Sequence, residues 1–534
     1  MREPSEKETA GAASAALLPL WAAVLAAAAG GLALVAAFPA LGIWPLSFVA
    51  VALSLLSLIG RRAGGALLVG AVFGASFYLP HIDWAASFLG DHPLRWVPWV
   101  ALAGVETLFT GLGAILISLA YRWVQALVAR PRLRTAVTTL LVAGVWTSRE
   151  LVMGSWPYGG FPWGRIGMSL GESPFAPLAS WVGPSGLTFL LVLAVAPAIE
   201  SARHLAAARR ENRRAWRTAV WPVALLIVMA IVPQFPTTAT GSIRVAAVQG
   251  DGPAAYLDER ERYDVLEAQL AASEPAADEA VDLVLWPEGG VDADPLADAN
   301  AALVLDRAVN ALGAPILMNA AVADGDLVYN TSMLWTADGA EQSHAKRYPV
   351  PFGEYVPQRE LYERIAPGLI GMIQREYTPG DDSPTVDVDG TTVGLAICFD
   401  VLFDQLVAEG IDDGAQALMF QTNNADFRGT DENLQQLAFA RMRAIETGRS
   451  VVNVSTVGTS QVIAPDGRTL EQIPSDEPGV IVADVELRDG TTPAVAAGEA
   501  IRSLLLWIPL VAIAVLGAAL DRMRRMRAEA NARG

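Results

Sequence analysis

The chain has 534 residues, of which 53% are hydrophobic and 18% are charged, and its mean hydropathy is +0.36. This composition is too apolar for an ordinary soluble globular protein. The single cysteine excludes an internal disulfide framework, and the four histidines lack the spacing of metal ligands, so we expect no metal site. The net charge of -18 is unevenly distributed, because residues 241–486 carry 42 acidic and only 14 basic side chains. We therefore expect no nucleic acid partner.

Eight apolar stretches approach the length that is needed to span a bilayer. The first is longer than the core of a signal peptide, which predicts a helix that stays in the chain. We predict a transmembrane bundle of about eight helices, with about seven in an N-terminal membrane domain at 1–240. A C-terminal helix and a basic cytoplasmic tail follow at 491–534. The stretches lie at 16–38, 42–59, 64–80, 98–120, 135–153, 184–199, 218–234 and 504–520.

Basic residues alternate between the loops on the two sides of these predicted helices. The short loops of one side carry only Arg95, Arg149 and Arg165, whereas those of the other side carry many more. This alternation is typical of the positive-inside rule, so we expect a cytoplasmic N-terminus and an acidic domain on the outer face. The basic segments lie at 2–7, 61–62, 122–134, 203–217 and 522–533.

The acidic domain, at 241–490, alternates short β-branched runs with helical patterns. Near-continuous apolar strands that alternate with helices indicate an α/β sandwich with covered sheets. Strands are predicted at 243–249, 282–288, 314–322, 392–399, 417–423 and 450–458, and helices at 258–272, 297–312 and 430–447.

Three residues with reactive side chains stand at the ends of strand candidates of this domain. Glu288 follows "LVLWP", Cys398 follows "VGLAI", and Lys346 lies in "SHAKRYPVPFGEYVP". Only two of the 38 basic residues are lysines, which indicates that a lysine is needed at 346. A thiolate is the nucleophilic form of cysteine, a carboxylate can take its proton, and an ammonium can stabilise an oxyanion. Taken singly, the three could instead be a solvated glutamate, a surface lysine and a cysteine that fills an apolar core.

The sequences around these three residues resemble characteristic segments of a known enzyme superfamily. "LVLWPEGG", "KRYPVPFGEYVP" and "GLAICFD" resemble the signature segments of the nitrilase superfamily, in the chain order Glu–Lys–Cys. With the flanking apolar helices, "GGFPWGRIG", "VAAVQG" and the stretch after "TNNADF", the whole chain resembles the bacterial apolipoprotein N-acyltransferases. The resemblance implies an extracytoplasmic nitrilase-like αββα sandwich. It makes Cys398 the nucleophile, Glu288 the general base and Lys346 the cation that stabilises the oxyanion.

The resemblance also implies supporting residues. Glu354 matches a second active-site glutamate, and Asn423, Asn424 and Arg441 are candidate supports of the site. This family commonly has tyrosine and glutamate after the cysteine, whereas this chain has Phe399 and Asp400. Any role that depends on the missing hydroxyl or on the longer acid is therefore in question.

The implied reaction is a two-step acyl transfer without a cofactor. Cys398 takes an acyl chain from a membrane phospholipid as a thioester, and the N-terminal cysteine amine of a diacylglyceryl-modified apolipoprotein then accepts it. The resemblance implies a monomer in the bacterial plasma membrane. The same triad would also serve a membrane-tethered amidase that acts on C–N bonds. A transporter or receptor with an inactive sensor domain is disfavoured because all three reactive residues are present and intramembrane charges are few.

A loop at 364–377 alternates arginines with apolar residues. It is either a lid that dips into the lipid or a packed amphipathic helix. The lid candidates are Ile365, Leu369, Ile370, Met372 and Ile373.

Overall fold

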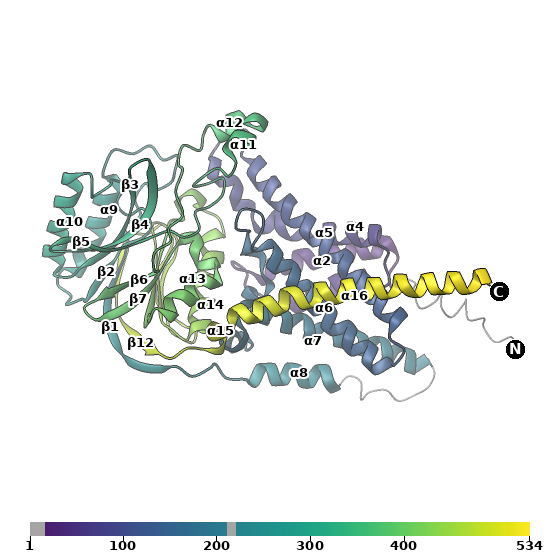
Figure 1. Cartoon of the computed structure of the whole chain (residues 1–534). Helices are drawn as coiled ribbons and strands as arrows, with labels where there is room; N and C mark the ends of the chain where they lie inside the picture. Colours follow the sequence, from purple (N-terminus) through teal and green to yellow (C-terminus); the bar gives the residue numbers. More distant parts are fainter. Residues whose placement is uncertain (1–15, 211–219, 534) are drawn as a thin grey trace.

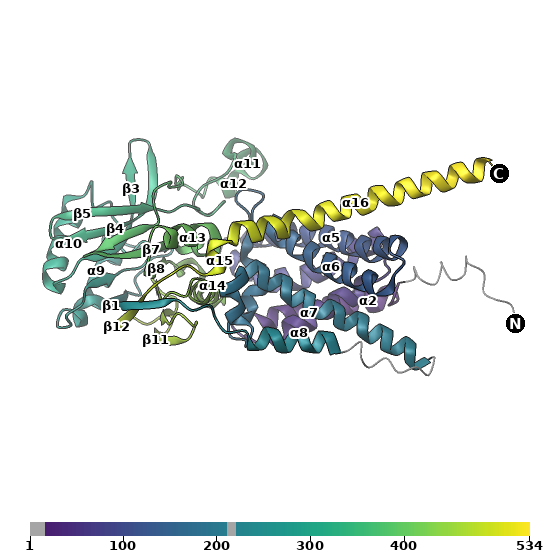
Figure 2. The same cartoon turned by 60° about the horizontal axis from the view of Figure 1, so that its bottom comes forward.

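The computed structural model describes residues 16–210 and 220–533 of the chain (Figure 1). The basic residues expected at 2–7, and those at 211–217, lie outside the described residues. The described part forms a bundle of apolar helices joined to a sandwich of two β-sheets, and the two parts lie end to end in both views (Figures 1 and 2).

Each predicted apolar stretch contains a helix. By length and composition, five helices of the described residues could cross a membrane: 20–37, 63–81, 96–127, 176–206 and 498–533. Of the other three, α3 and α8 are shorter, and α6 carries four charged residues. The expected number of about eight spanning helices is therefore not confirmed. The helices are α2 (Leu20–Ala37), α3 (Pro45–Leu58), α4 (Ala63–His81), α5 (Trp96–Leu127), α6 (Pro131–Met153), α7 (Ala179–Arg210), α8 (Val220–Ile231) and α16 (Gly498–Arg533).

Small residues let the first helices of the bundle approach one another closely. A Cβ atom on Gly70 of α4 would lie 2.4 Å from the Cβ of Ala114 on α5, so glycine is required at this crossing. Gly31 of α2 meets α4 in the same way, because its Cβ would lie 2.6 Å from the carbonyl oxygen of Phe73. Such small-residue contacts are typical of helices that pack in lipid.

The sandwich consists of two six-stranded sheets. The first runs in the order β12–β1–β2–β3–β4–β5 and the second in the order β11–β10–β9–β8–β7–β6. The strands of the first sheet are β12 (Gly479–Asp489), β1 (Thr238–Gln249), β2 (Leu283–Leu285), β3 (Ile316–Asp324), β4 (Leu327–Thr336) and β5 (Gly339–Ala345). Those of the second are β11 (Thr469–Ile473), β10 (Ser460–Ile463), β9 (Val451–Ser455), β8 (Ala417–Thr422), β7 (Thr391–Ile397) and β6 (Thr385–Val388).

The layers of this sandwich are those expected for an αββα fold. Val245 and Leu285 of one sheet share a buried core with Leu395 and Met419 of the other. Helices α9 (Asp264–Ser273) and α10 (Ala299–Leu312) cover the outer face of the first sheet. Helices α13 (Asp404–Asp412) and α14 (Glu432–Thr447) cover the outer face of the second. The predicted fold class is therefore confirmed.

Several predicted boundaries differ from the structure. The helix expected from 258 begins only at Asp264, because Tyr263 before it has a left-handed φ of 76°. The strand expected to end at 399 ends at Ile397, where the chain turns into a short 3-10 helix. Strands β4, β5, β6 and β10 to β12 and helix α13 were not predicted.

The second sheet's helix layer joins the sandwich to the helix bundle. Phe439 of α14 packs on Trp163, which precedes α7, with ring centroids 5.5 Å apart. The side-chain oxygen of Gln435 accepts hydrogen bonds from the indoles of Trp84 and Trp163 at 3.1 and 2.6 Å. Its amide nitrogen donates to the carbonyl of His81 at 3.0 Å. Gln435 thus pairs with buried polar groups of the helix bundle.

Candidate active site

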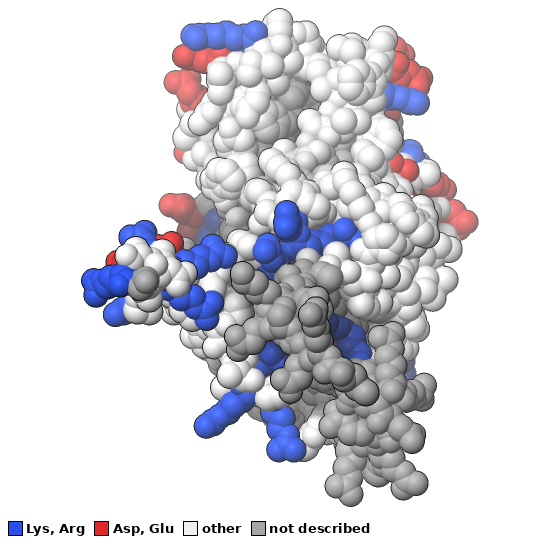
Figure 3. All heavy atoms as spheres, turned by 90° about the vertical axis from the view of Figure 1, so that its right-hand side faces the viewer, with Lys and Arg blue, Asp and Glu red and all other residues white. Residues whose placement is uncertain are grey.

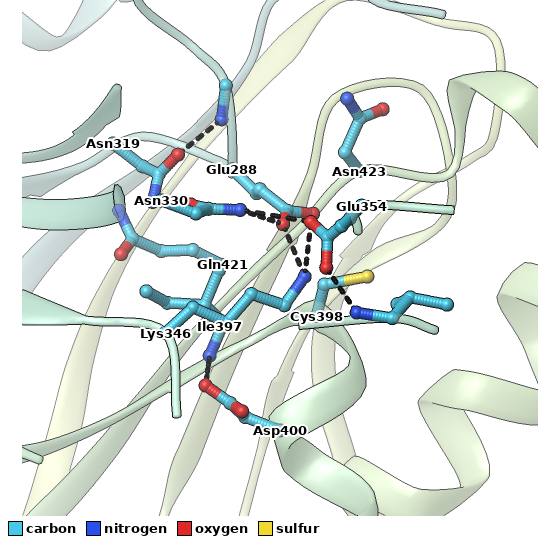
Figure 4. Close-up of polar contacts among 12 residues, drawn as sticks. Glu288, Asn319, Asn330, Lys346, Glu354, Ile397, Cys398, Asp400, Gln421 and Asn423 are labelled. Carbon is cyan, nitrogen blue, oxygen red and sulfur yellow. Dashed lines mark hydrogen bonds and ion pairs between the residues drawn. The ribbon is translucent and has the colours of Figure 1, made fainter. Parts of the chain in front are cut away.

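The three reactive residues come from strand ends of both sheets. Glu288 follows β2, Lys346 directly follows β5, and Cys398 directly follows β7. Figure 4 shows their side chains converging between the sheets, next to the loop that carries Glu354. The fold therefore brings together residues that lie more than a hundred positions apart in the sequence.

Lys346 is the centre of this cluster. Its ammonium nitrogen lies 2.9 Å from Oε1 of Glu288 and 2.9 Å from Oε1 of Glu354 (Figure 4). The lysine side chain is only 1% exposed. Burial works to lower the pKa of Lys346, but the two carboxylates outweigh it and hold that pKa well above its ordinary value. A permanent positive charge is therefore fixed inside the site.

Two asparagines orient the carboxylates. Nδ2 of Asn330 donates to Oε1 of Glu288 at 2.7 Å and to Oε1 of Glu354 at 3.3 Å. Asn319 donates in turn to Oδ1 of Asn330 at 2.8 Å and accepts from the backbone of Gly289 at 2.7 Å. The sequence analysis missed both residues. The only signal for them was an amide in each of two apolar strands, which is costly to bury without a partner.

Glu354 is held by the loop that follows Lys346. Its second oxygen, Oε2, accepts a hydrogen bond from the backbone N–H of Val350 at 2.7 Å. The loop closes on itself, because the Glu354 N–H donates to the Val350 carbonyl and the Phe352 N–H to the Tyr355 carbonyl, each at 2.8 Å. Glu354 is thereby held in place as the second carboxylate that contacts the Lys346 ammonium.

Cys398 opens the 3-10 helix Cys398–Leu402 with a φ of 51°. A non-glycine residue in this left-handed region is strained, and such strain is common where a side chain must be presented to a site. Burial raises the pKa of the Cys398 thiol well above its ordinary value, and the charge of Glu288 raises it further, against the effect of Lys346. The resting group is therefore a thiol, which needs a base before it can attack.

Asp400 and Phe399 have structural partners that explain their positions. Asp400 is fully buried and accepts hydrogen bonds from the backbone of Tyr348 at 2.8 Å and of Ile397 at 3.3 Å. Burial raises its pKa to about 6. Phe399 stacks on Phe161 of the helix bundle, with centroids 6.3 Å apart. Asp400 thus ties the cysteine turn to the lysine loop, and Phe399 ties it to the membrane part.

The remaining predicted supports separate into two groups. Asn423 lies at the site, where its side chain bonds the backbone of Ala254 and Ala425 (Figure 4). Asn424 is buried behind the cysteine. Arg441 is not brought into the site, because its guanidinium bonds the Gly467 carbonyl at 2.7 Å and the Thr469 hydroxyl at 3.2 Å. It lies on a different face of α14 and braces the β10–β11 turn.

The lid candidates are only partly exposed. They lie on and after two short helices, α11 (Arg359–Ile365) and α12 (Pro367–Ile370). Ile365 is 68% exposed, Leu369 and Met372 are half-buried, and Ile370 and Ile373 are buried. Of the five candidates only Ile365 is therefore exposed. Ile370 and Ile373 instead pack with Val356, Phe352 and Tyr362 in a small core of their own.

The fold and this site define a membrane-associated protein with a domain of the carbon–nitrogen hydrolase class. Residues 244–492 match the carbon–nitrogen hydrolase family model, and residues 30–196 match that of the apolipoprotein N-acyltransferase N-terminal domain. An apolipoprotein N-acyltransferase of Mycolicibacterium smegmatis is 31% identical over 94% of this chain and 87% of its own length. One of Azotobacter vinelandii is 29% identical over 95% of this chain and 96% of its own length. The chain belongs to the apolipoprotein N-acyltransferase family.

Solved structures match a part of this chain. Nit3 of Saccharomyces cerevisiae, a member of branch 10 of the nitrilase superfamily, is 20% identical, with a TM-score of 0.37. The match covers 46% of this chain and 91% of that one. An amidase of Nesterenkonia is 19% identical and gives a TM-score of 0.34 over 47% of this chain and 92% of its own.

Proposed function

We propose that this protein transfers an acyl chain from a membrane phospholipid to the N-terminal amine of a diacylated apolipoprotein, through a thioester on Cys398. The observation that carries the proposal is the buried Lys346 ammonium, held 2.9 Å from each of two carboxylates beside the chain's one cysteine. The names of the relatives supply the acceptor class, and the apolar helices support a donor that lies in the membrane.

In the first step Glu288 takes the proton of the Cys398 thiol, and the sulfur attacks the carbonyl carbon of a phospholipid ester. The C–S bond forms and the oxygen becomes negative, next to the Lys346 ammonium. Collapse of this intermediate breaks the ester C–O bond. The proton on Glu288 passes to the departing alkoxide, and a lysophospholipid leaves.

In the second step the α-amine of the apolipoprotein attacks the thioester carbonyl. Lys346 again faces the negative oxygen, and Glu288 takes a proton from the attacking nitrogen. The C–S bond breaks, an amide is released, and the proton returns to the Cys398 sulfur. Glu354 positions the lysine through both steps.

The orientation of the site supports an extracytoplasmic reaction. Basic side chains gather at the end of the helix bundle that faces away from the sandwich (Figure 3). They include Arg62 before α4 and Arg130 before α6, whereas α4 and α6 run toward the sandwich. By the positive-inside rule the basic end is cytoplasmic, so the sandwich faces outward.

The α11–α12 segment supports entry of a lipid substrate. It lies beside the helix bundle, where the Tyr362 hydroxyl of α11 is 3.0 Å from that of Tyr158 in the loop after α6. Leu361 and Ile365 of α11 are 48% and 68% exposed. We include in the proposal that this segment, with a buried face and an exposed one, lies at the lipid surface.

The test is an assay with purified full-length protein, labelled phospholipid and a diacylated lipopeptide. We expect an acyl-thioester on the protein, followed by an amide on the lipopeptide. Both should vanish in Cys398→Ala. Acylation of the lipopeptide that persists in that variant, which has no cysteine, would refute the mechanism. Release of free fatty acid alone, or of ammonia from small amides, would favour the amidase alternative.

A further inference from the structure

A chain of buried side chains also reaches the sulfur of Cys398 from helix α14. Nε2 of Gln436, on α14, lies 3.4 Å from the sulfur atom and donates to it. In the part of the chain that the structure describes, this amide is the one hydrogen-bond donor to that sulfur. Gln436 is only 2% exposed, so no water competes freely for the contact.

The direction of this hydrogen bond is determined by its neighbours. The backbone N–H of Gly458 can only donate, and it donates to the Ser455 hydroxyl at 2.9 Å. That hydroxyl donates to Oδ1 of Asn424 at 2.6 Å, so the nitrogen of Asn424 points the other way. Nδ2 of Asn424 donates to Oε1 of Gln436 at 2.7 Å. The nitrogen of Gln436 must then face the sulfur.

Glu432 lies one turn before Gln436 on α14 and is the third residue that holds this group of amides in place. Its Oε2 accepts the second N–H of Asn424 at 2.7 Å, and its side chain is buried. With both N–H groups and its carbonyl paired, Asn424 cannot turn without leaving a buried polar group unpaired. The carboxylate therefore fixes the amide that in turn fixes Gln436.

We propose that Gln436 is a catalytic residue that donates a hydrogen bond to the Cys398 sulfur, and that Asn424 and Glu432 are positioning residues that hold its amide in the donor orientation. The proposal rests on the proposed function, in which this sulfur is the nucleophile. A donor at the sulfur stabilises the thiolate before attack and again when it leaves the tetrahedral intermediate. The hydrogen stays on Gln436 throughout, since the thiol proton goes to Glu288.

The test uses the chain's single cysteine. Alkylation by iodoacetamide, followed by mass spectrometry across a pH series, reports the ionisation of Cys398 alone and needs no lipid substrate. We expect Gln436→Met, which keeps length and removes the donor, to raise the pH midpoint of alkylation by about one unit. The acyl-transfer kcat should fall about tenfold. An unchanged midpoint would overturn the proposal.

Gln435→Met is the matched control on the neighbouring position. Its amide pairs with Trp84, Trp163 and His81 and not with the sulfur. We expect this variant to lower the melting temperature and to leave the alkylation midpoint where it is. An equal rise of the midpoint in both variants would mean that the effect is structural, and the proposal would be wrong.

Two variants of Glu432 test the positioning role while Gln436 stays in place. The charged groups that act on the thiol are Glu288, Lys346, Glu432 and Glu354. Burial raises the pKa of Glu432 to about 8, so Glu432→Gln and Glu432→Leu both remove the same titratable group, but only glutamine keeps an acceptor for Asn424. We expect the leucine variant to have the higher midpoint, by about one unit. Equal midpoints would overturn the positioning role.

The outcomes separate this proposal from the proposed function. If acyl transfer requires Cys398 but Gln436→Met leaves the pH midpoint of alkylation unchanged, only the donor role of Gln436 fails. If Cys398→Ala still acylates the lipopeptide, the thioester route of the proposed function fails whatever the midpoint is.

Discussion

The ammonium of Lys346 lies 2.9 Å from the carboxylate of Glu354, eight residues further along the chain. The lysine is 1% exposed, and its other partner, Glu288, lies at the same distance from it and follows strand β2. A buried ion pair of this kind is weak evidence for stability, because desolvation offsets the attraction, but removal of one partner is costly. The pairing therefore serves the site, and its geometry sets the first two predictions.

Lys346→Arg should be inactive although the charge is kept. The planar guanidinium is larger than an ammonium and presents its donors in a fixed fork, which the space between two carboxylates does not fit. We expect kcat for acyl transfer to fall about 10²–10³-fold, the usual loss for one oxyanion donor. Near-normal turnover in a variant that folds as the parent does would refute the role of the ammonium.

Glu288→Gln and Glu354→Gln should lower the rate of thioester formation by different amounts. Without the base, Glu288→Gln should form the acyl-thioester about 10²–10⁴-fold more slowly in a single turnover. Glu354→Gln keeps the base, so the thioester should still form, with a rate lowered about tenfold because the lysine loses one of its two anchors. Identical single-turnover rates in the two variants would contradict these separate roles.

Glu288 and Cys398 could be predicted from the sequence because each follows an apolar strand, and Lys346 because lysines are rare in the chain and its local sequence is specific. Asn330 and Gln436 could not, because their partners come from other strands and helices and appear only when the chain is folded. The resemblance made Arg441 a candidate support of the site, and it lies on α14, the helix that also carries Gln436. Five residues along a helix correspond to a rotation of about 140° from the starting face, which takes Arg441 away from the sulfur.

The fold could be predicted where strands are buried and apolar. Strand β5 was missed because it is the edge of its sheet and is polar and half exposed, with the sequence "GAEQSHA". Strand β4, which pairs with it, was missed as well. The number of spanning helices is not confirmed, because apolar composition does not fix length and α3 has only 14 residues. In the segment of the lid candidates, Ile370 and Ile373 are buried by contacts with Val356, which the apolar spacing of the sequence alone does not reveal.

Asp404→Asn should destabilise the junction between the two parts. Its carboxylate binds Arg165 from the loop before α7 at 2.8 Å and Arg443 of α14 at 2.7 Å. All three side chains are at most 7% exposed, so the variant leaves the buried Arg165 guanidinium without its counter-charge and Arg443 with Glu446 alone. We expect a loss of about 3–5 kcal/mol in the free energy of unfolding, measured by denaturation in detergent. Asp412→Asn, at an exposed position of α13, is the control and should change little.

The pH dependence of stability should follow from the same carboxylate. Burial works to raise the pKa of Asp404, but Arg165, Arg443 and Arg502 outweigh it and hold that pKa well below its ordinary value. A depressed pKa stabilises the folded state above the unfolded pKa of about 4, and this stability is lost as the pH falls further. The melting temperature of the parent should therefore fall more steeply below pH 4 than that of Asp404→Asn. Equal slopes would exclude this linkage.

Ile365→Asp should raise KM only for a substrate that lies in a bilayer. This side chain is 68% exposed on α11, beside the helix bundle, so a carboxylate there would oppose insertion into lipid. Burial of an isoleucine side chain contributes about 1.5–3 kcal/mol, so we expect KM for phospholipid in vesicles to rise about tenfold. KM for a short-chain, water-soluble donor should not change. Leu303→Asp, on the far face of α10 and 47% exposed, is the control. If Ile365→Asp raised both KM values equally, the segment would act on the site itself and not at the lipid surface.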